Sequence, residues 1–355
     1  MANSLYIHIP FCRKKCLYCD FYSFPCNYDI VIAYINTLIK QIEQIDNKFL
    51  TIYIGGGTPS LLSLALIKKL LSSLQKNIQN NTEFTIEVNP DSLTREKSNL
   101  FLDYKVNRLS IGVQSFNNET LKKLGRIHNA EKSIDAIRIA ANAGFKNINI
   151  DLIFGIWGQC INDWNRELSL AVKLPIKHIS CYALSYEKKT GLYRKVQSKN
   201  ITPLDSALVA EMFEYTIEYL PTKGFLHYEV SNFSKKEYEC RHNFNYWQNN
   251  DYIGLGESAV SYINGERIKN IGEKISRERL SIEKRAKETA ALKIRTKEGI
   301  NFTWFKQKTG FDVKEFIKDS LDNLLANNLV KLDARNIKLT KKGFLFADTI
   351  SSSFL

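Results

Sequence analysis

Three cysteines near the N-terminus, Cys12, Cys16 and Cys19, constrain this chain more than any other feature, because they form the pattern C-x3-C-x2-C. Thiolates are the usual ligands of iron–sulfur clusters, and a [4Fe–4S] cluster contains four irons. Three thiolates would leave one iron open, and an open iron can bind the amino and carboxylate groups of S-adenosylmethionine (SAM). One electron from the reduced cluster can then break the sulfonium bond and release an adenosyl radical. The spacing therefore predicts a [4Fe–4S] cluster held by these three residues.

A zinc site is the alternative interpretation of the three cysteines. Structural zinc usually takes four ligands, often as two spaced pairs. Asp20 or Cys26 could supply a fourth ligand, so zinc stays open at this point. Phe11, Tyr18 and Phe21 flank the cysteines and could keep water away from a reduced cluster.

Composition indicates a protein that folds in a reducing compartment. The chain has 355 residues with 44% hydrophobic content, which is enough for one large core and a smaller domain. No segment approaches the roughly 18–20 apolar residues of a membrane span, and the N-terminal sequence does not resemble a signal peptide. Seven cysteines, an odd number, do not suggest a disulfide framework. Cys160 and Cys181 are expected to be buried, and the cytoplasm is the predicted location.

The net charge of +13 permits three kinds of partner: nucleic acid, an anionic membrane surface or an acidic ligand. Lysines are scattered along the chain, and no arginine-rich tract or alternation of aromatic and basic residues occurs. A basic composition alone is weak support for nucleic-acid binding. We therefore expect no nucleic acid, and we expect any membrane contact to be peripheral, at the inner face.

Short apolar runs alternate with amphipathic helical patterns over the first 200 residues. Runs of this length suit strands that are buried on both faces, as in parallel sheets. The predicted strands are Leu5–Ile9, Thr51–Gly55, Phe84–Val88, Arg108–Val113, Asn147–Ile153 and His178–Ala183. Helices are predicted from Tyr28 to about Ile45, from a cap at Ser60 through Leu74, and from Asn129 to Gly144. The alternation predicts an α/β fold, a partial (β/α)6 barrel, with ligands at the carboxyl ends of the strands.

The alternation fades after about residue 200, which suggests three parts. We predict a core domain at 1–225, a connecting region at 226–298 and a small winged-helix-like module at 299–355. Residues 276–293 read as a charged helix. Leu329–Leu332 and Ile337–Leu339 read as a two-stranded wing, and Thr340 as the cap of a last helix.

Several polar motifs fall at the ends of predicted strands. The run Gly55–Ser60 (GGGTPS) would let the backbone approach a ligand closely, although a glycine triplet alone is only a tight turn. Glu87 and Gln114 end the third and fourth strands, and Arg126 follows twelve residues after Gln114. Asp151 interrupts an apolar strand, where a charge is costly unless it is paired or functional. These residues are candidate ligand contacts.

A second group of candidate residues lies in the segment Arg241–Trp247 (RHNFNYW), which follows Cys240. Imidazole is a normal axial ligand of heme iron, and aromatic rings can pack against a porphyrin. Without further context this segment would be interpreted as a surface turn. His128 and His178 are expected to be ordinary surface or core histidines.

Together these motifs resemble the radical SAM superfamily and, within it, the oxygen-independent coproporphyrinogen-III oxidase family. The resemblance covers nearly the whole chain and includes GGGTPS, EVNP, GVQSF, NIDLIFG, YEVSNF and HNFNYW. It implies that Cys12, Cys16 and Cys19 hold the cluster. It also implies that SAM contacts come from Tyr6, Tyr18, Gly56, Gly57, Thr58, Glu87, Gln114, Arg126, Asp151 and Ala183.

Two departures separate the branches of this family. The decarboxylating oxidases carry a fourth cysteine two residues after the third and a long N-terminal extension, whereas this chain has Phe21 there and eleven residues before Cys12. Both departures favour the heme-chaperone subgroup, HemW, with coproporphyrinogen oxidation as the alternative. The subgroup motif HNxxYW implies heme contacts from His242, Asn243, Tyr246 and Trp247.

Such chaperones bind heme and pass it to respiratory hemoproteins of the membrane, and family members tend to form homodimers. Three positions of this chain differ from the usual pattern. Trp157 stands where a proline is expected, Cys160 where threonine is common, and Val260 where a histidine is common. If that histidine contributes to heme binding in relatives, heme handling differs in this chain.

Overall fold

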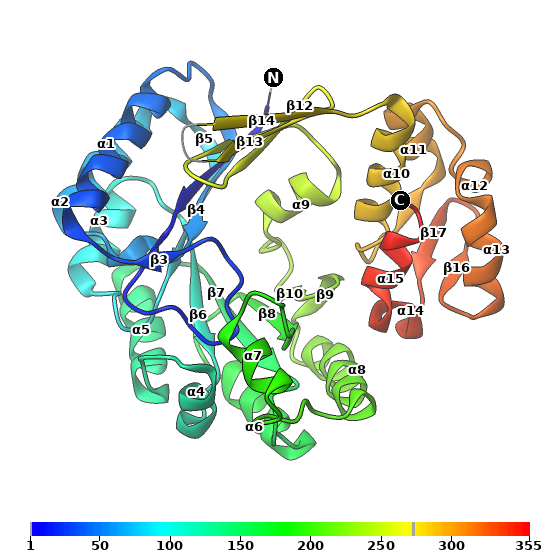
Figure 1. The fold of residues 1–355 in the computed structure, drawn as a ribbon, viewed down its shortest axis with the longest axis horizontal. Helices are drawn as coiled ribbons and strands as arrows, with labels where there is room; N and C mark the ends of the chain where they lie inside the picture. The colour runs from blue at the N-terminus through cyan, green and yellow to red at the C-terminus, as the bar shows by residue number, and fades with distance from the viewer. Residues whose placement is uncertain (1, 272–273) are drawn as a thin grey trace.

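A computed structural model describes residues 2–271 and 274–355. Twelve strands of this described part form one curved sheet in the order β14-β13-β12-β11-β1-β4-β5-β6-β7-β8-β10-β9. The outermost strands of the sheet, β14 and β9, do not pair with each other in these residues, so the barrel is open, as predicted. Helices surround the strands on the outside of the curve (Figure 1).

All six predicted strands are present and pair in parallel in chain order. The seventh parallel strand is β11, which pairs with β1 from the other side. The parallel strands are β1 (Ser4–Ile9), β4 (Phe49–Gly56), β5 (Ile78–Val88), β6 (Arg108–Gln114), β7 (Asn147–Phe154), β8 (His178–Ala183) and β11 (Tyr252–Leu255).

The two faces of these strands differ, although their sequences read as continuous apolar runs. On β6, Leu109, Ile111 and Val113 are fully buried, and they belong to the core under the outer helices. Arg108 and Ser110 alternate with them and point to the inside of the curve, where they line a cavity. Successive side chains of a strand point to opposite faces, so one strand supplies both the core and the cavity.

The first eight α-helices lie between the parallel strands along the chain, where crossover connections are needed. They are α1 (Tyr28–Glu43), α2 (Leu64–Ser73), α3 (Arg95–Asp103), α4 (Asn118–Leu124), α5 (Ala130–Ala143), α6 (Ile161–Ala171), α7 (Gly191–Gln197) and α8 (Ser206–Thr222). Short 3-10 turns occur at Pro59–Leu61 and Gln75–Asn77, and β2 (Phe11–Cys12) pairs with β3 (Phe24–Pro25).

Three local predictions are wrong. Ser63, not Ser60, caps α2, because Pro59 opens a 3-10 turn first; Ser60 is buried and bonded to Ser92. The charged helix of residues 276–293 begins only at Ile282, since residues 274–279 form an edge strand. Cys160 is exposed as the N-cap of α6, whereas Cys181 is buried as expected.

The region predicted to connect core and module contributes strands to the same sheet. Besides β11, its elements are β9 (Leu226–Glu229), β10 (Asn232–Ser234), α9 (Arg241–Trp247), β12 (Val260–Ile263), β13 (Glu266–Ile271), β14 (Lys274–Arg279) and α10 (Ile282–Lys293). Helix α9 lies on the inner side of the curved sheet (Figure 1). The domain boundaries themselves stay predictions.

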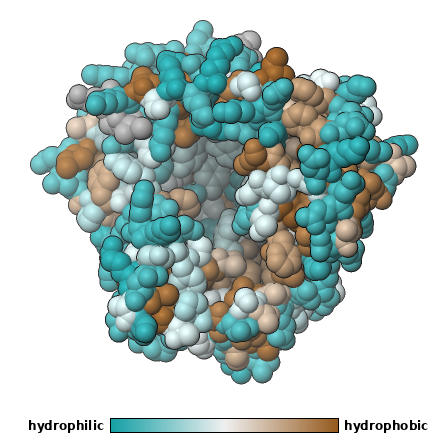
Figure 2. Space-filling model, turned by 45° about the vertical axis from the view of Figure 1, so that its right-hand side comes forward, coloured by the Kyte–Doolittle hydropathy of each residue, from teal (hydrophilic) through white to brown (hydrophobic). Residues whose placement is uncertain are grey.

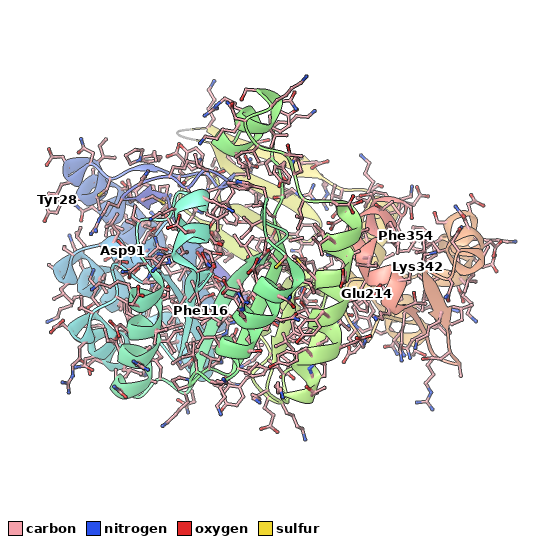
Figure 3. All side chains as sticks on the ribbon, turned by 90° about the horizontal axis from the view of Figure 1, so that it is seen from below. Tyr28, Asp91, Phe116, Glu214, Lys342 and Phe354 are labelled. Carbon is pink, nitrogen blue, oxygen red and sulfur yellow. The ribbon has the colours of Figure 1, made fainter. Side chains whose placement is uncertain are left out.

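The C-terminal module contains the predicted wing. Its elements are β15 (Ile300–Asn301), α11 (Phe302–Thr309), α12 (Val313–Phe316), α13 (Lys318–Ala326), β16 (Val330–Leu332), β17 (Asn336–Leu339), α14 (Lys341–Leu345) and α15 (Ala347–Ser352). Thr340 caps α14, as expected. An ion pair of 3.3 Å joins Lys341 to Glu214 on α8, and Figure 3 shows Glu214 beside this module.

In the described ranges, every helix falls short of the length and apolar character needed to cross a membrane.

Trp164 is expected to be a main contributor to stability. Its side chain is fully buried between α6 and the sheet, and its Nε1–H donates to Thr216 Oγ1 of α8 at 2.8 Å. Replacement of Trp164 by Ala should lower the free energy of unfolding by about 3–5 kcal/mol, because a large cavity remains. Denaturant titration measures this loss. Trp164→Phe should lose less, and equal losses in both variants would contradict the packing argument.

Candidate functional site

A cavity of about 520 Å³ opens on the inner side of the curved sheet. The inner faces and carboxyl ends of β4 to β8, the cysteine segment and one residue of α9 line it. Figure 2 shows the corresponding face of the molecule hollowed at its centre. Its size is within the range of pockets that bind a cofactor-sized molecule, about 300–1,000 Å³.

Most of the residues predicted to bind the cluster or SAM meet at this cavity. Those that line it are Cys12, Cys16, Cys19, Tyr18, Gly56, Gly57, Thr58, Glu87, Gln114, Arg126, Asp151 and Ala183. Tyr6 is not among the lining residues; its hydroxyl is hydrogen-bonded to His8 Nδ1 at 3.0 Å. Of the residues predicted to bind heme, Asn243 lines the cavity, and His242, Tyr246 and Trp247 do not.

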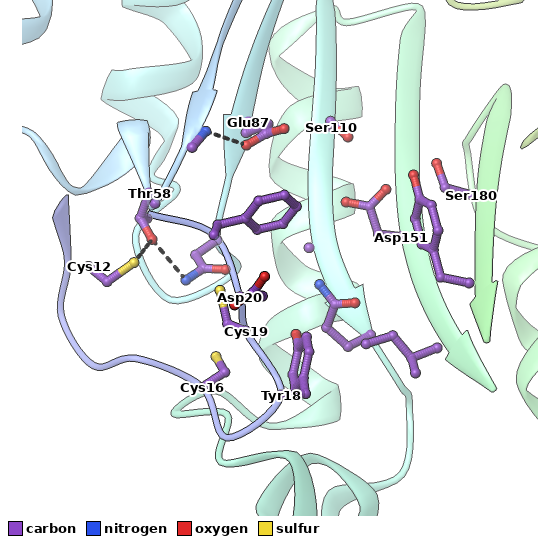
Figure 4. Close-up of a pocket in the computed structure, with 18 of the residues that line it drawn as sticks. Cys12, Cys16, Tyr18, Cys19, Asp20, Thr58, Glu87, Ser110, Asp151 and Ser180 are labelled. Carbon is purple, nitrogen blue, oxygen red and sulfur yellow. Dashed lines mark hydrogen bonds between the residues drawn. The ribbon is translucent and has the colours of Figure 1, made fainter. Parts of the chain in front are cut away.

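The three cysteines come from one loop that curves around the carboxyl ends of the strands (Figure 4). Cys12 is buried, and Cys16 and Cys19 are half-buried. Thr58 Oγ1 donates to Cys12 Sγ at 3.6 Å, and Arg126 Nη1 donates to Cys16 Sγ at 3.4 Å. Burial raises the pKa of the Cys12 and Cys19 thiols. Bound iron would reverse this effect, because a coordinating thiol is deprotonated.

The loop is tied to the rest of the protein at its middle and at its end. Leu17 N–H donates to Leu124 O at 3.1 Å, and Leu17 O accepts from Leu192 N–H at 2.8 Å. The carbonyl of Tyr22 is bonded to His8 Nε2 at 2.8 Å, and the hydroxyl of Tyr22 donates to Glu257. Segments far apart in the chain therefore hold the cysteine loop in place.

The residues present fit a [4Fe–4S] cluster. A Cβ added at Gly57 would lie 2.7 Å from the Phe11 carbonyl oxygen and 3.0 Å from Cys12 Sγ, so only glycine leaves room here. Arg126 Nε is buried at the site without a hydrogen-bond partner among the described residues. In residues 2–271 and 274–355, no three His, Cys, Asp or Glu side chains gather tightly enough for a single metal ion. A four-iron cluster has a wider ligand set, because each thiolate binds a different iron.

Glu87 is held at the end of β5 by two donors. The Tyr53 hydroxyl donates to Oε1 at 2.8 Å, and the backbone N–H of Gly56 donates to Oε2 at 3.0 Å. Gly56 has φ +116°, a conformation that favours glycine. Burial raises the pKa of Glu87 to about 7 despite these bonds. The carboxyl group is therefore fixed in position and poised to change its charge near neutral pH.

Arg126 joins three parts of the site. Its Nη2 donates to Gly112 O of β6 at 2.8 Å and also to Asn89 Oδ1, while Nη1 reaches Cys16. Gln114 ends β6 with φ +68°, which is uncommon for a residue with a side chain. The guanidinium of Arg126 thus places positive charge beside the cysteine loop.

Asp151 lies on the inner face of β7 and opens on the cavity (Figure 4). Asn149 Nδ2 donates to its Oδ1 at 2.8 Å, and burial raises its pKa. Asn149 also donates to Ser110 Oγ at 2.7 Å. The polar neighbours explain how a carboxyl group is accommodated inside an otherwise apolar strand.

The sequence interpretation missed several lining residues that the structure places around the same cavity. They are Tyr53, Asn89, Arg108, Ser110, Asn149, Ser180 and Tyr182. Two of them stand two residues from a predicted contact: Asn149 before Asp151 on β7, and Asn89 after Glu87, just past the end of β5. This alternation was the signal available in the sequence, because residues i and i+2 share a strand face.

The predicted heme segment forms α9, and a buried carboxylate holds its first turn. Glu83 accepts from the backbone N–H groups of Arg241 and His242, both at 3.0 Å. His242 is buried, with Nδ1 bonded to Thr51 Oγ1 at 2.8 Å and Nε2 to the Tyr246 hydroxyl at 3.0 Å. Burial lowers the pKa of His242 to about 3, so the imidazole is neutral at physiological pH.

The two aromatic residues that end this segment, Tyr246 and Trp247, differ in their surroundings. The Tyr246 ring packs edge-on against Tyr252 at 4.6 Å, whereas the Trp247 ring lies 5.2 Å from the Arg295 guanidinium. The indole Nε1 of Trp247 is buried and has no hydrogen-bond partner within 2–271 and 274–355. Val260, where the resemblance leads one to expect histidine, begins β12 and is half-buried.

Comparison with known proteins gives two domain matches and many full-length relatives. Residues 6–171 match the radical SAM superfamily, and residues 280–346 match the HemN C-terminal domain. A Lactococcus lactis protein named heme chaperone HemW is 35% identical over 369 residues, covering 99% of this chain and 97% of its own length. A Bacillus subtilis protein of the same name is 33% identical over 377 residues, covering 99% of each.

Among solved structures, the coproporphyrinogen III oxidase HemN from Escherichia coli, a radical SAM enzyme, superimposes with a TM-score of 0.85. The match covers 99% of this chain and 89% of that one, at 22% sequence identity. At this identity the match establishes the radical SAM fold of the chain, including its partial barrel.

Glu87 should make the stability of the ligand-free protein depend on pH. Its folded pKa of about 7 exceeds its value in the unfolded chain, so its contribution is present below about pH 4.5 and is lost as the pH rises to about 7. Glu87→Gln removes this titration. Between pH 4.5 and 8 the variant should gain about 1–2 kcal/mol relative to the wild type, a figure reduced for screening by water in the cavity.

Denaturant titration at both pH values, without cluster or SAM, measures this difference. Parallel pH dependence in the two proteins would show that Glu87 ionises normally in the folded state.

Proposed function

Because the chain belongs to the heme chaperone HemW family, within the radical SAM superfamily, we propose that it binds heme and transfers it to a recipient hemoprotein. The observation that carries this proposal is a shared cavity. The cysteine loop and the predicted SAM contacts line one side, and Asn243 of the HNxxYW motif reaches the same space. A ligand bound there would contact both sets of residues.

We propose that Cys12, Cys16 and Cys19 hold a [4Fe–4S] cluster and that the surrounding residues bind SAM. When bound, the cluster would supply an open iron site for SAM and a source of one electron. Arg126 would offset the negative charge of the thiolates, since its guanidinium already donates to Cys16. Glu87 and Asp151 would offer hydrogen-bond acceptors to the amine and hydroxyl groups of SAM.

We propose His242 as a ligand of heme iron, with Asn243, Tyr246 and Trp247 as further contacts. A neutral imidazole is the form that binds metals, and burial keeps His242 neutral. Both of its ring nitrogens are hydrogen-bonded to hydroxyl groups. Heme binding through Nε2 therefore requires Tyr246 to release this nitrogen, which ties heme capture to a movement within α9.

We propose that the recipients are hemoproteins of the membrane and that contact with the membrane is peripheral. The net charge of +13 supports docking on anionic lipid, where each well-placed Lys or Arg contributes at most about 1 kcal/mol. We also propose a homodimer and a cytoplasmic location at the inner face, as in the resemblance described above. Nucleic acid is not among the proposed partners.

Substitution of any one of Cys12, Cys16 or Cys19 by Ala should abolish the cluster. Loss of one thiolate removes one of only three protein ligands, so iron and sulfide should not be retained after anaerobic reconstitution. The broad visible absorbance and the iron and sulfide content measure this. Cys26→Ala, an exposed neighbour in the same segment, is the control and should keep both. Unchanged spectra in all three variants would reject these ligands.

His242→Ala should weaken heme binding by at least tenfold, because it removes the proposed axial nitrogen. The heme Soret band, followed in an anaerobic titration with and without SAM, measures the affinity. His227→Gln is the control, since His227 packs between Phe233 and Phe344 and does not line the cavity. Equal affinity in wild type and His242→Ala would place the heme ligand elsewhere.

The same preparation separates the chaperone from the alternative oxidase. Coproporphyrinogen III and SAM are added to the reconstituted protein under anaerobic conditions, and protoporphyrinogen IX is sought by chromatography. The chaperone proposal expects no turnover. Robust production of protoporphyrinogen IX would replace it with oxidative decarboxylation.

A further inference from the structure

Arg108 places a positive charge inside the cavity. The predicted cluster and SAM sites do not account for this charge. It is the first residue of β6, is only 2% exposed and lines the cavity. Its Nε atom is buried without a hydrogen-bond partner, and in the described ranges no ion pair includes its guanidinium. Arginine stays charged in proteins and has five donors, so an unpartnered buried guanidinium is costly.

The nearby carboxylates are already engaged by other donors. Glu83 accepts from two backbone N–H groups of α9, and Glu87 accepts from Tyr53 and Gly56. Asp151 accepts from Asn149. In the part of the chain that the structure describes, none of these acids forms an ion pair with Arg108. The guanidinium therefore has donors free for a group that enters the cavity.

Arg108 lies at the opposite end of the cavity from the cysteine loop. Gln114 ends the same strand six residues later, about 20 Å along β6 at the usual rise per residue. Strand pairing places Arg108 beside Thr85 of β5 and Asn147 of β7, at the start of β6 and β7. A group held at Arg108 is thus separate from one held at the cysteines.

We propose that Arg108 is an anion-binding residue that receives a carboxylate of a ligand in this cavity. The planar guanidinium fork matches a carboxylate with two parallel hydrogen bonds, and the enclosed site strengthens them. Ser110, buried one inner-face position further along β6, offers a hydroxyl beside it. This inference rests on the proposed function for its ligand, because heme carries the required carboxylate in its propionates.

Two ligands that differ only in the carboxylate test the proposal. Heme is compared with heme dimethyl ester in anaerobic titrations of the full chain with reconstituted cluster. Arg108→Gln should weaken heme binding by about 10- to 100-fold, since charge-assisted bonds are lost. It should leave binding of the dimethyl ester unchanged. Arg138→Gln, an exposed arginine of α5, is the matched control and should alter neither affinity.

A loss of affinity confined to heme supports a propionate at Arg108. Equal effects on heme and its dimethyl ester, or no effect on either, would overturn the inference alone. A wild type that binds neither ligand would overturn the proposed function, and this inference with it. Should Arg108→Gln lose its cluster or its cooperative melting, Arg108→Lys replaces it, with a smaller loss of heme affinity expected.

Discussion

Parallel pairing of β1 with β4 through β8 is the constraint on which the whole site depends. Because the strands run in one direction, their carboxyl ends meet at one edge, and residues far apart in the chain become neighbours there. Glu87 lies near the end of β5, Arg126 follows β6 and Asp151 lies within β7, yet all three line one cavity. A shift of one residue in any strand would turn its inner side chains into the helical layer, so register and site are specified together.

The order of the strands could be predicted from the sequence because each strand is a short apolar run between helical patterns. What could not be predicted lies where local and tertiary preferences compete. Ser60 has the side chain of a helix cap, but Pro59 before it starts a 3-10 turn and Ser63 takes the role. Residues 274–279 are charged enough for a helix, but they pair with β13 along its full length.

The cavity could be predicted in outline, since the polar residues that interrupt or end apolar strands do line it. Arg108 was missed because a charged residue at the start of a strand is normally solvated, and only the curved sheet shows that it turns inward. Tyr6 is the opposite case: it is a predicted SAM contact, but its hydroxyl is bonded to His8 and it does not line the cavity. The proximity of α9 to this space also depends on Glu83, whose contact with Arg241 spans 158 positions of the chain.

The backbone of Leu17 is held on both sides, by Leu124 O and by the N–H of Leu192. Because Leu17 lies between Cys16 and Tyr18, any rearrangement of the cysteine loop must either keep these two backbone hydrogen bonds or break them. The amide protons of Leu17 and Leu192 would then exchange with deuterated solvent at different rates in the two cases. Protection of these two amide protons from exchange therefore reports the conformation of the cysteine loop without a chromophore.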